Sequence, residues 1–245
     1  MPEQENWLTA IFNDHLAGLA NAILGALNIH AENPARPWQT WIVMELLVAA
    51  ILVVLFAAVR STFSVDKPGK LQHILEVTYE FIKATTDEIG IHHGAKYVPF
   101  FGTLFIFILV MNLIGIIPAF ESPTMNPAVP AGLAVCTFLY YNTMGIKENG
   151  LFKYLAHFAG PMLALAPLMI PIELISHLAR PLTLTVRLYG NMFAGETVTN
   201  VFIRLTYLIG PVIFMALHVF VAFIQAYVFM LLAVIYVSGA TAHEH

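Results

Sequence analysis

Five long apolar runs constrain this chain more than any other feature of its sequence. They cover residues 41–59, 98–117, 131–146, 161–202 and 211–237. A helix needs about 20 mostly apolar residues to cross a bilayer, and most of these runs approach or exceed that length. Charged residues make up 11% of the chain, whereas about 25% is usual in soluble domains. The sequence therefore predicts an all-α integral membrane protein with about five membrane-crossing helices, and it excludes a soluble domain or a nucleic-acid-binding protein.

The fourth run is too long for one upright crossing. About 40 residues at 1.5 Å each give a helix of about 60 Å, twice the ~30 Å hydrocarbon core. Such a helix must either break, for which Pro167, Pro171 and Pro181 offer positions, or lie strongly tilted. The last run is also somewhat long, so we expect the final two helices to be long and tilted together.

Basic residues set the expected orientation, because they gather on the cytoplasmic side of membrane proteins. Five of the eleven lie between the first two runs, and only Arg36 precedes the first. This bias predicts an outer N-terminus and a cytoplasmic C-terminus. The acidic N-terminal end lacks the basic region of a secretory signal.

Two further segments show helical amphipathicity. Residues 71–89 separate an apolar face from one carrying Gln72, Glu76, Glu80, Lys83 and Asp87, which predicts a helix on the inner surface. A similar pattern within residues 1–40 predicts a second helix on the outer surface. Each helix either lies at the membrane interface or packs against a partner subunit.

Polar residues in the fourth run share one helical face. At 100° per residue, an arc of about 80° around Arg187 includes Glu173, Ser176, Arg180, Thr183 and Asn191. Ionisable groups are costly in lipid, so this stripe must face water or protein. Arg187 and Glu173 are about 21 Å apart along the helix, too far to pair, whereas Arg180 and Glu173 can meet.

A second polar face is expected opposite the first. Glu196 lies about 180° from Arg187, so it must address another helix, and His218 on the last run offers a plausible partner. Gln225 and Tyr236 follow His218 on the same face. Glutamate and histidine can relay protons, whereas arginine stays protonated. This combination favours gated proton transfer over a simple pore.

Other candidate residues carry weaker signals. Asn112 in the second run either bonds across helices or takes part in function. His92–His93 and the terminal His243 and His245 lack the further ligands of a metal site, so we expect no metal or other cofactor. Neither a nucleotide-binding motif nor a nucleophile motif is present. We therefore expect a chain that is not catalytic alone.

The stretch RPLTLTVRLYGNMFAGE, residues 180–196, strongly resembles the signature of subunit a of F-type ATP synthases. Residues 218–240 resemble its final helix. KPGKLQHILEVTYEFI, residues 67–82, and FILVMNLIGIIP resemble two earlier segments. The resemblance covers nearly the whole chain from about residue 41.

The resemblance implies a stator beside a rotating c-ring, whose subunits each carry a membrane carboxylate, with two offset half-channels leading to it. Arg187 would be the essential arginine facing those carboxylates. Glu196, His218 and nearby Asn112 would belong to the outer half-channel, and Gln225 would lie opposite Arg187. The polar path would be lined by Asn191, Glu173 and Ser176.

The implied partners are the c-ring, subunit b of the peripheral stalk, the remaining synthase subunits and membrane lipid, with no nucleic acid and no nucleotide on this chain. The order of Glu196 and His218 resembles that in bacterial members, which implies a bacterial inner (plasma) membrane.

Two other functions make different predictions about the sequence. A secondary transporter would instead predict an internal repeat, and a purely structural subunit would predict no buried arginine in a polar stripe. The choice between H⁺ and Na⁺ stays open.

Overall fold

A computed structural model describes residues 6–26, 28, 33–64, 69–91, 94–117, 120–151, 153–154, 166–205 and 209–241. Within these ranges every regular element is a helix. The long helices are α1 (Trp7–Ala26), α2 (Thr40–Thr62), α3 (Lys70–Glu88), α4 (Val98–Ile114), α5 (Ala128–Asn149), α7 (Ala166–Leu205) and α8 (Ile209–Thr241). Two short 3₁₀ helices, η1 (Gly94–Lys96) and η2 (Pro123–Met125), precede α4 and α5.

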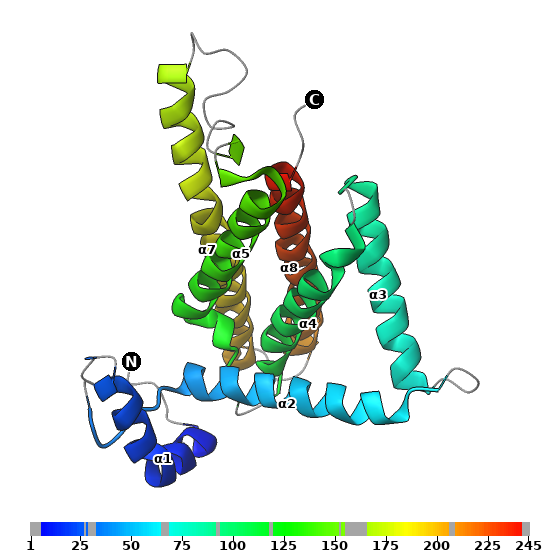
Figure 1. Ribbon diagram of the computed structural model, residues 1–245. Coiled ribbons are helices and arrows are strands. Elements are labelled where there is room, and N and C mark those ends of the chain that lie inside the picture. The colour runs from blue at the N-terminus through cyan, green and yellow to red at the C-terminus, as the bar shows by residue number, and fades with distance from the viewer. Residues whose placement is uncertain are drawn as a thin grey trace.

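The bundle of α4, α5, α7 and α8 forms the centre of the molecule (Figure 1). Its core is built from apolar side chains that the helices turn toward one another. Among them are the fully buried side chains of Phe101, Ile108, Leu188, Met192 and Phe229. At one end α5 and α8 approach so closely that only a glycine fits. A Cβ on Gly145 would lie 2.6 Å from the Tyr154 ring and 2.9 Å from the Ala240 carbonyl oxygen.

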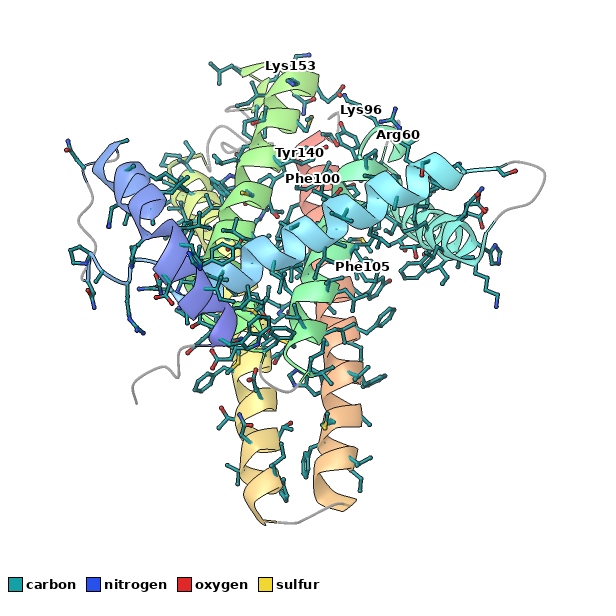
Figure 2. All side chains as sticks on the ribbon, turned by 90° about the horizontal axis from the view of Figure 1, so that it is seen from below. Arg60, Lys96, Phe100, Phe105, Tyr140 and Lys153 are labelled. Carbon is teal, nitrogen blue, oxygen red and sulfur yellow. The ribbon has the colours of Figure 1, made fainter. Side chains whose placement is uncertain are left out.

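Helix α2 runs across the direction of the bundle, and α3 stands beside α4 at the far end of α2 (Figure 1). Figure 2 shows the same crossing from below. At the other end of α2, α1 is fastened by the Asn13 side chain, which bonds the backbone nitrogen and oxygen of Trp38 at 2.9 and 3.1 Å. The edge-to-face contact of Phe12 with Trp38 adds to this attachment.

Helix α7 does not break. It runs continuously over 40 residues, with Pro171 and Pro181 inside it, and α8 runs over 33 residues. The prediction that the last two helices are long is therefore confirmed, and of the two alternatives for the fourth run the broken helix is wrong. Their tilt relative to a membrane stays a prediction.

Two helices of the described chain are long and apolar enough to cross a membrane, within Thr40–Ser61 and Val212–Thr241. Helix α4 is a shorter apolar helix. It ends at Ile114 and a turn begins at Gly115, whereas the apolar run was expected to extend to residue 117. The structure supports an all-helical membrane protein, and the count of five crossings stays a prediction.

Candidate functional site

The polar stripe of α7 lies along the edge of the bundle. Leu184, Leu188 and Met192 point into the core, and Arg187 lies about 100° around the helix from Leu188. Arg187 is consequently exposed, as are Ser176 and Asn191. That this face meets water or another protein stays a prediction. A lipid environment would be costly for such groups, so the edge requires water or another protein.

One predicted contact of the stripe is confirmed. The Arg180 guanidinium and the Glu173 carboxylate lie 3.6 Å apart. The same guanidinium lies over the ring of Tyr236 on α8, 5.2 Å from the ring centroid, in the geometry of a cation–π interaction. Arg180 is thus held by an ion pair with Glu173 and by the ring of Tyr236, whereas Arg187 forms no ion pair among the described residues.

Helices α7 and α8 are joined beside Arg187 by one side-chain hydrogen bond. The Asn191 amide donates to the Gln225 carbonyl oxygen at 2.5 Å. Asn191 follows Arg187 by one helical turn, about 6 Å along the axis. Gln225 is 3% exposed, and within the described residues its Nε2 has no hydrogen-bond partner. The structure therefore places Gln225 next to the Arg187 segment of α7.

Glu196 and His218 line one cavity of about 230 Å³ between α7, α8 and the residues that follow α4. Gly195 allows the close approach of the two long helices there, because a Cβ on it would lie 2.9 Å from Nδ1 of His218. The Glu196 Oε2 atom is buried and has no hydrogen-bond partner among the described residues. Thr199 and Asn200 add polar groups to the wall. Two titratable side chains therefore border one space that is large enough for several water molecules.

Asn112 bonds across helices and does not line this cavity. It is fully buried, donates to the Ala222 carbonyl on α8 at 3.3 Å, and accepts from the Thr124 hydroxyl at 2.8 Å. Its backbone also interacts with the His218 imidazole. Asn112 therefore fixes the helix that carries His218, and the first of its two sequence readings, bonding across helices, is confirmed.

A second polar cluster was not singled out from the sequence. His177 on α7 is 7% exposed and lies with its Nε2 2.9 Å from Oδ1 of Asn142 on α5. The Tyr154 hydroxyl donates to the same oxygen at 2.7 Å, and the Tyr141 hydroxyl lies 3.5 Å from the imidazole. A titratable residue beside Ser176 in an apolar run was the signal that could have found it. The cluster joins α5 to the N-terminal half of α7.

Potential metal ligands do not gather in the described part of the chain, where no group of three or more His, Cys, Asp or Glu side chains could hold an ion. His92, His93, His243 and His245 lie outside the described residues.

Taken together, the apolar helices, the polar edge of α7 and the two titratable side chains at one cavity define an all-helical, membrane-embedded protein. Residues 41–238 match the family described as ATP synthase A chain. ATP synthase subunit a of Solibacter usitatus is 60% identical over 235 residues, 96% of this chain and 100% of that protein. ATP synthase subunit a of Koribacter versatilis is 46% identical over the full length of both chains, and that of Geotalea uraniireducens is 43% identical over 91% of this chain and 94% of its own.

The chain therefore belongs to the family of ATP synthase subunit a, as its resemblance to the F-type subunit indicated. Its family makes it a component of the multi-subunit ATP synthase. The family match starts at residue 41, which leaves α1 outside it, whereas the similarity to the Koribacter protein includes α1.

Proposed function

We propose that this chain is the proton-translocating stator subunit of a rotary F-type ATP synthase. It provides two half-channels, and Arg187 faces the membrane carboxylates of the rotating c-ring. The observation that carries the proposal is the position of Arg187. It is exposed at the bundle edge, and along the continuous helix α7 it lies between two polar clusters, the Glu196–His218 cavity and the Glu173–Arg180 pair.

The two clusters lie on opposite sides of Arg187 along α7. The cavity with Glu196 and His218 begins about 14 Å toward the C-terminus, and the Glu173–Arg180 pair lies about 10 to 21 Å toward the N-terminus. We assign the first to the outer half-channel and the second, with Ser176, to the inner one. Asn112 supports the outer half-channel by holding α4 against α8.

Arginine separates the clusters chemically. Its guanidinium stays protonated at physiological pH, so a proton cannot pass from one cluster to the other through Arg187. It can instead attract a carboxylate from a neighbouring subunit and hold it ionised. Protons must then cross on the carboxylates of the moving ring, which couples their flow to rotation.

The surface around Arg187 suits such a partner. Leu182, Val186 and Phe193 are 63%, 58% and 47% exposed and lie about 100–140° around α7 from Arg187, on the adjoining exposed face of the helix. A ring of apolar helices, each with one carboxylate, matches an apolar surface with one cation. The Asn191–Gln225 bond holds α7 and α8 together at this surface.

The central test replaces Arg187 by alanine. In inverted membrane vesicles, Arg187→Ala should abolish ATP-driven acidification while the soluble head still hydrolyses ATP and the complex stays assembled. Arg36→Ala, which removes an exposed arginine from the loop before α2, should leave acidification at the wild-type rate. Acidification at wild-type rate in Arg187→Ala would remove this residue from the mechanism and favour a transporter with another path.

Two further variants test whether a positive charge alone suffices at position 187 and how much the relay group His218 contributes. Arg187→Lys should also fail largely, because a compact ammonium lacks the planar fork and its pKa shifts readily when it is buried. His218→Ala should slow acidification less completely than Arg187→Ala, because water can partly replace a relay group. A loss in His218→Ala equal to or greater than that in Arg187→Ala would overturn this ordering of the two residues.

The proposal extends to partners and location. Subunit b of the peripheral stalk and the remaining synthase subunits would hold the chain against the ring in a bacterial inner membrane, with the N-terminus outside and the C-terminus in the cytoplasm. Protease protection of epitope tags at the two ends, in inverted and right-side-out vesicles, tests that orientation. Equal protection of both tags in one preparation would contradict it.

A further inference from the structure

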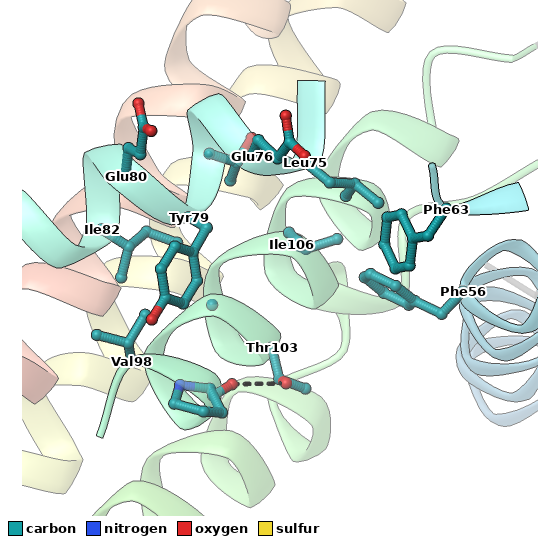
Figure 3. A pocket seen from close by; sticks show the side chains of 13 residues that line it. Phe56, Phe63, Leu75, Glu76, Tyr79, Glu80, Ile82, Val98, Thr103 and Ile106 are labelled. Carbon is teal, nitrogen blue, oxygen red and sulfur yellow. Dashed lines mark hydrogen bonds between the residues drawn. The ribbon is translucent and has the colours of Figure 1, made fainter. Parts of the chain in front are cut away.

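A cavity of about 460 Å³ lies between the end of α2, the amphipathic helix α3 and the first half of α4 (Figure 3). It is separate from the polar edge of α7 and from the Glu196–His218 cavity. Its walls are formed by Phe56, Phe63, Leu75, Glu76, Thr78, Tyr79, Glu80, Ile82, Val98, Pro99, Gly102, Thr103 and Ile106. The volume falls within the range of about 300–1,000 Å³ that is usual for small-molecule sites.

The inner part of this cavity is apolar. Phe56 and Phe63 lie at one end and Val98 and Ile106 along α4 (Figure 3). The hydroxyls of Thr103 and Thr78 each donate within their own helix, to the Pro99 and Ile74 carbonyls at 2.8 Å. The Tyr79 hydroxyl lies on the Val98 side of the cavity (Figure 3). An occupant of the end lined by Phe56, Phe63 and Ile106 must therefore be a hydrocarbon, because a polar group there would lose its hydration without finding partners.

The rim of the cavity is charged. Glu76 and Glu80 lie one turn apart on α3, and their carboxylates project away from the Val98 and Thr103 side of the cavity (Figure 3). Gln72 donates to Oε1 of Glu76 at 2.8 Å, which orients that carboxylate and leaves it further acceptor capacity. Among the described lining residues none is basic, so the rim attracts a cation.

A positive group lies on the α2 side. Arg60 is exposed in the last turn of α2, four residues after Phe56 and three before Phe63. The spacing of four residues places it on the same face of α2 as Phe56, and Phe63 follows directly after the end of the helix. The cavity therefore combines an apolar interior with carboxylates on α3, and a guanidinium on α2 lies outside the lining residues, one helical turn from Phe56.

The cavity is too small to enclose a partner helix. A helix about 10 Å wide fills roughly 420 Å³ in each 5.4 Å turn, so 460 Å³ would admit about one turn. A partner helix would need a groove many turns long. A single hydrocarbon chain, thin and flexible, fits the space.

We propose that this cavity binds one phospholipid whose headgroup carries a primary amine. One acyl chain fills the apolar interior, the ammonium group lies at Glu76 and Glu80, and the phosphate lies toward Arg60. The amphipathic character of α3 supports this assignment, because such a helix lies at the level of lipid headgroups. The bound lipid would fill the space that α3 leaves against α4.

The test uses the purified whole synthase in phosphatidylcholine vesicles that contain a trace of a photoactivatable phospholipid with a diazirine in its acyl chain. Three probes carry ethanolamine, choline or glycerol headgroups. Labelling of segments 56–63, 75–82 and 98–106 is read by peptide mass spectrometry. We expect the ethanolamine probe to label them about three- to tenfold more than the choline probe, as two exposed ion pairs allow.

Two variants separate the chain from the headgroup. A Cβ on Gly102 would meet Ile82 Cδ1 at an ordinary 3.6 Å, so Gly102→Leu extends into the cavity and should abolish labelling by all probes. Glu76→Gln with Glu80→Gln should lower ethanolamine labelling to the choline level. The matched control Glu88→Gln removes an exposed carboxylate of α3 that does not line the cavity, and it should change nothing.

Three results would overturn the proposal. Equal labelling by all three probes in the wild-type complex would mean that headgroup chemistry plays no part. Unchanged labelling in Gly102→Leu would mean that the chain does not enter the cavity. Labelling of a neighbouring subunit in place of these segments would show that a protein partner covers the site. If Gly102→Leu fails to assemble, the glutamate variants and their control still decide the headgroup claim.

Discussion

Gly195 controls the position of His218, and replacing it by alanine gives a sharp test of the outer half-channel. The new Cβ would lie 2.9 Å from Nδ1 of His218, where ordinary contacts begin at 3.4 Å. The imidazole must therefore retreat by about 0.5 Å, or α7 and α8 must separate. His218 is 7% exposed, so the space open to a retreating imidazole is the cavity of about 230 Å³ that it lines, away from its present position.

The expected magnitude follows from the cost of overpacking, about 1–3 kcal/mol. At 1.4 kcal/mol for each factor of ten, the fraction of molecules with His218 in its present position falls roughly 5- to 150-fold. If transport needs that position, Gly195→Ala should slow the initial rate of ATP-driven acidification by the same factor. The rate in His218→Ala sets the lower limit.

Two comparisons make the assay specific. Gly132→Ala is the control, because Gly132 lies in α5 with nothing within 4 Å of the added Cβ, and it should acidify normally. Gly195→Ala combined with His218→Ala should match His218→Ala alone, because the clash is then gone. Wild-type acidification in Gly195→Ala would refute the reasoning, and so would additive losses in the double variant.

Three other outcomes are expected from contacts away from the proposed ring surface. Asn112→Leu should lower the thermal stability of the complex by about 1–3 kcal/mol, because it leaves buried polar partners unpaired; an unchanged melting curve would contradict this. Gly145→Ala should prevent normal assembly, since its Cβ would meet the Tyr154 ring at 2.6 Å, and normal yield on a native gel would count against it. The hydrogen bond from Lys96 to Glu148 raises the pKa of Lys96 above its ordinary 10.5. The contribution of this bond to stability is therefore fully present below pH 10.5 and is lost as the pH rises through the raised pKa. Lys96→Gln should consequently lower the melting temperature by the same small amount at about pH 7 and about pH 9.

The helices of this chain were predictable because their apolar runs are long and contrast with their surroundings. The expected segment 71–89 is α3 (Lys70–Glu88), and the expected run 131–146 lies inside α5 (Ala128–Asn149). The ends of α5 extend further than hydropathy suggested, because polar residues such as Asn149 continue a helix beyond its apolar part until Gly150, at a φ of 75°, ends it.

The polar face of α7 was also predictable, because helical periodicity alone places Arg180 near Glu173. The cluster of His177 and Asn142 was not, because it joins side chains 35 residues apart and depends on the packing of α5 against α7. The same reason hid the cavity between α2, α3 and α4. The roles of Arg187, Glu196 and His218 in transport stay predictions, since helix geometry places groups and does not show what moves between them.

The continuity of α7 has a mechanical consequence. Under the proposed function, each ring carboxylate that passes Arg187 pulls on it sideways. The helix is attached on both sides of that point, to α5 through His177 and Asn142 and to α8 through Asn191 and Gln225. A force on Arg187 is therefore shared between two neighbouring helices instead of bending one, and the electrostatic attraction becomes torque on the ring with little deflection of the stator.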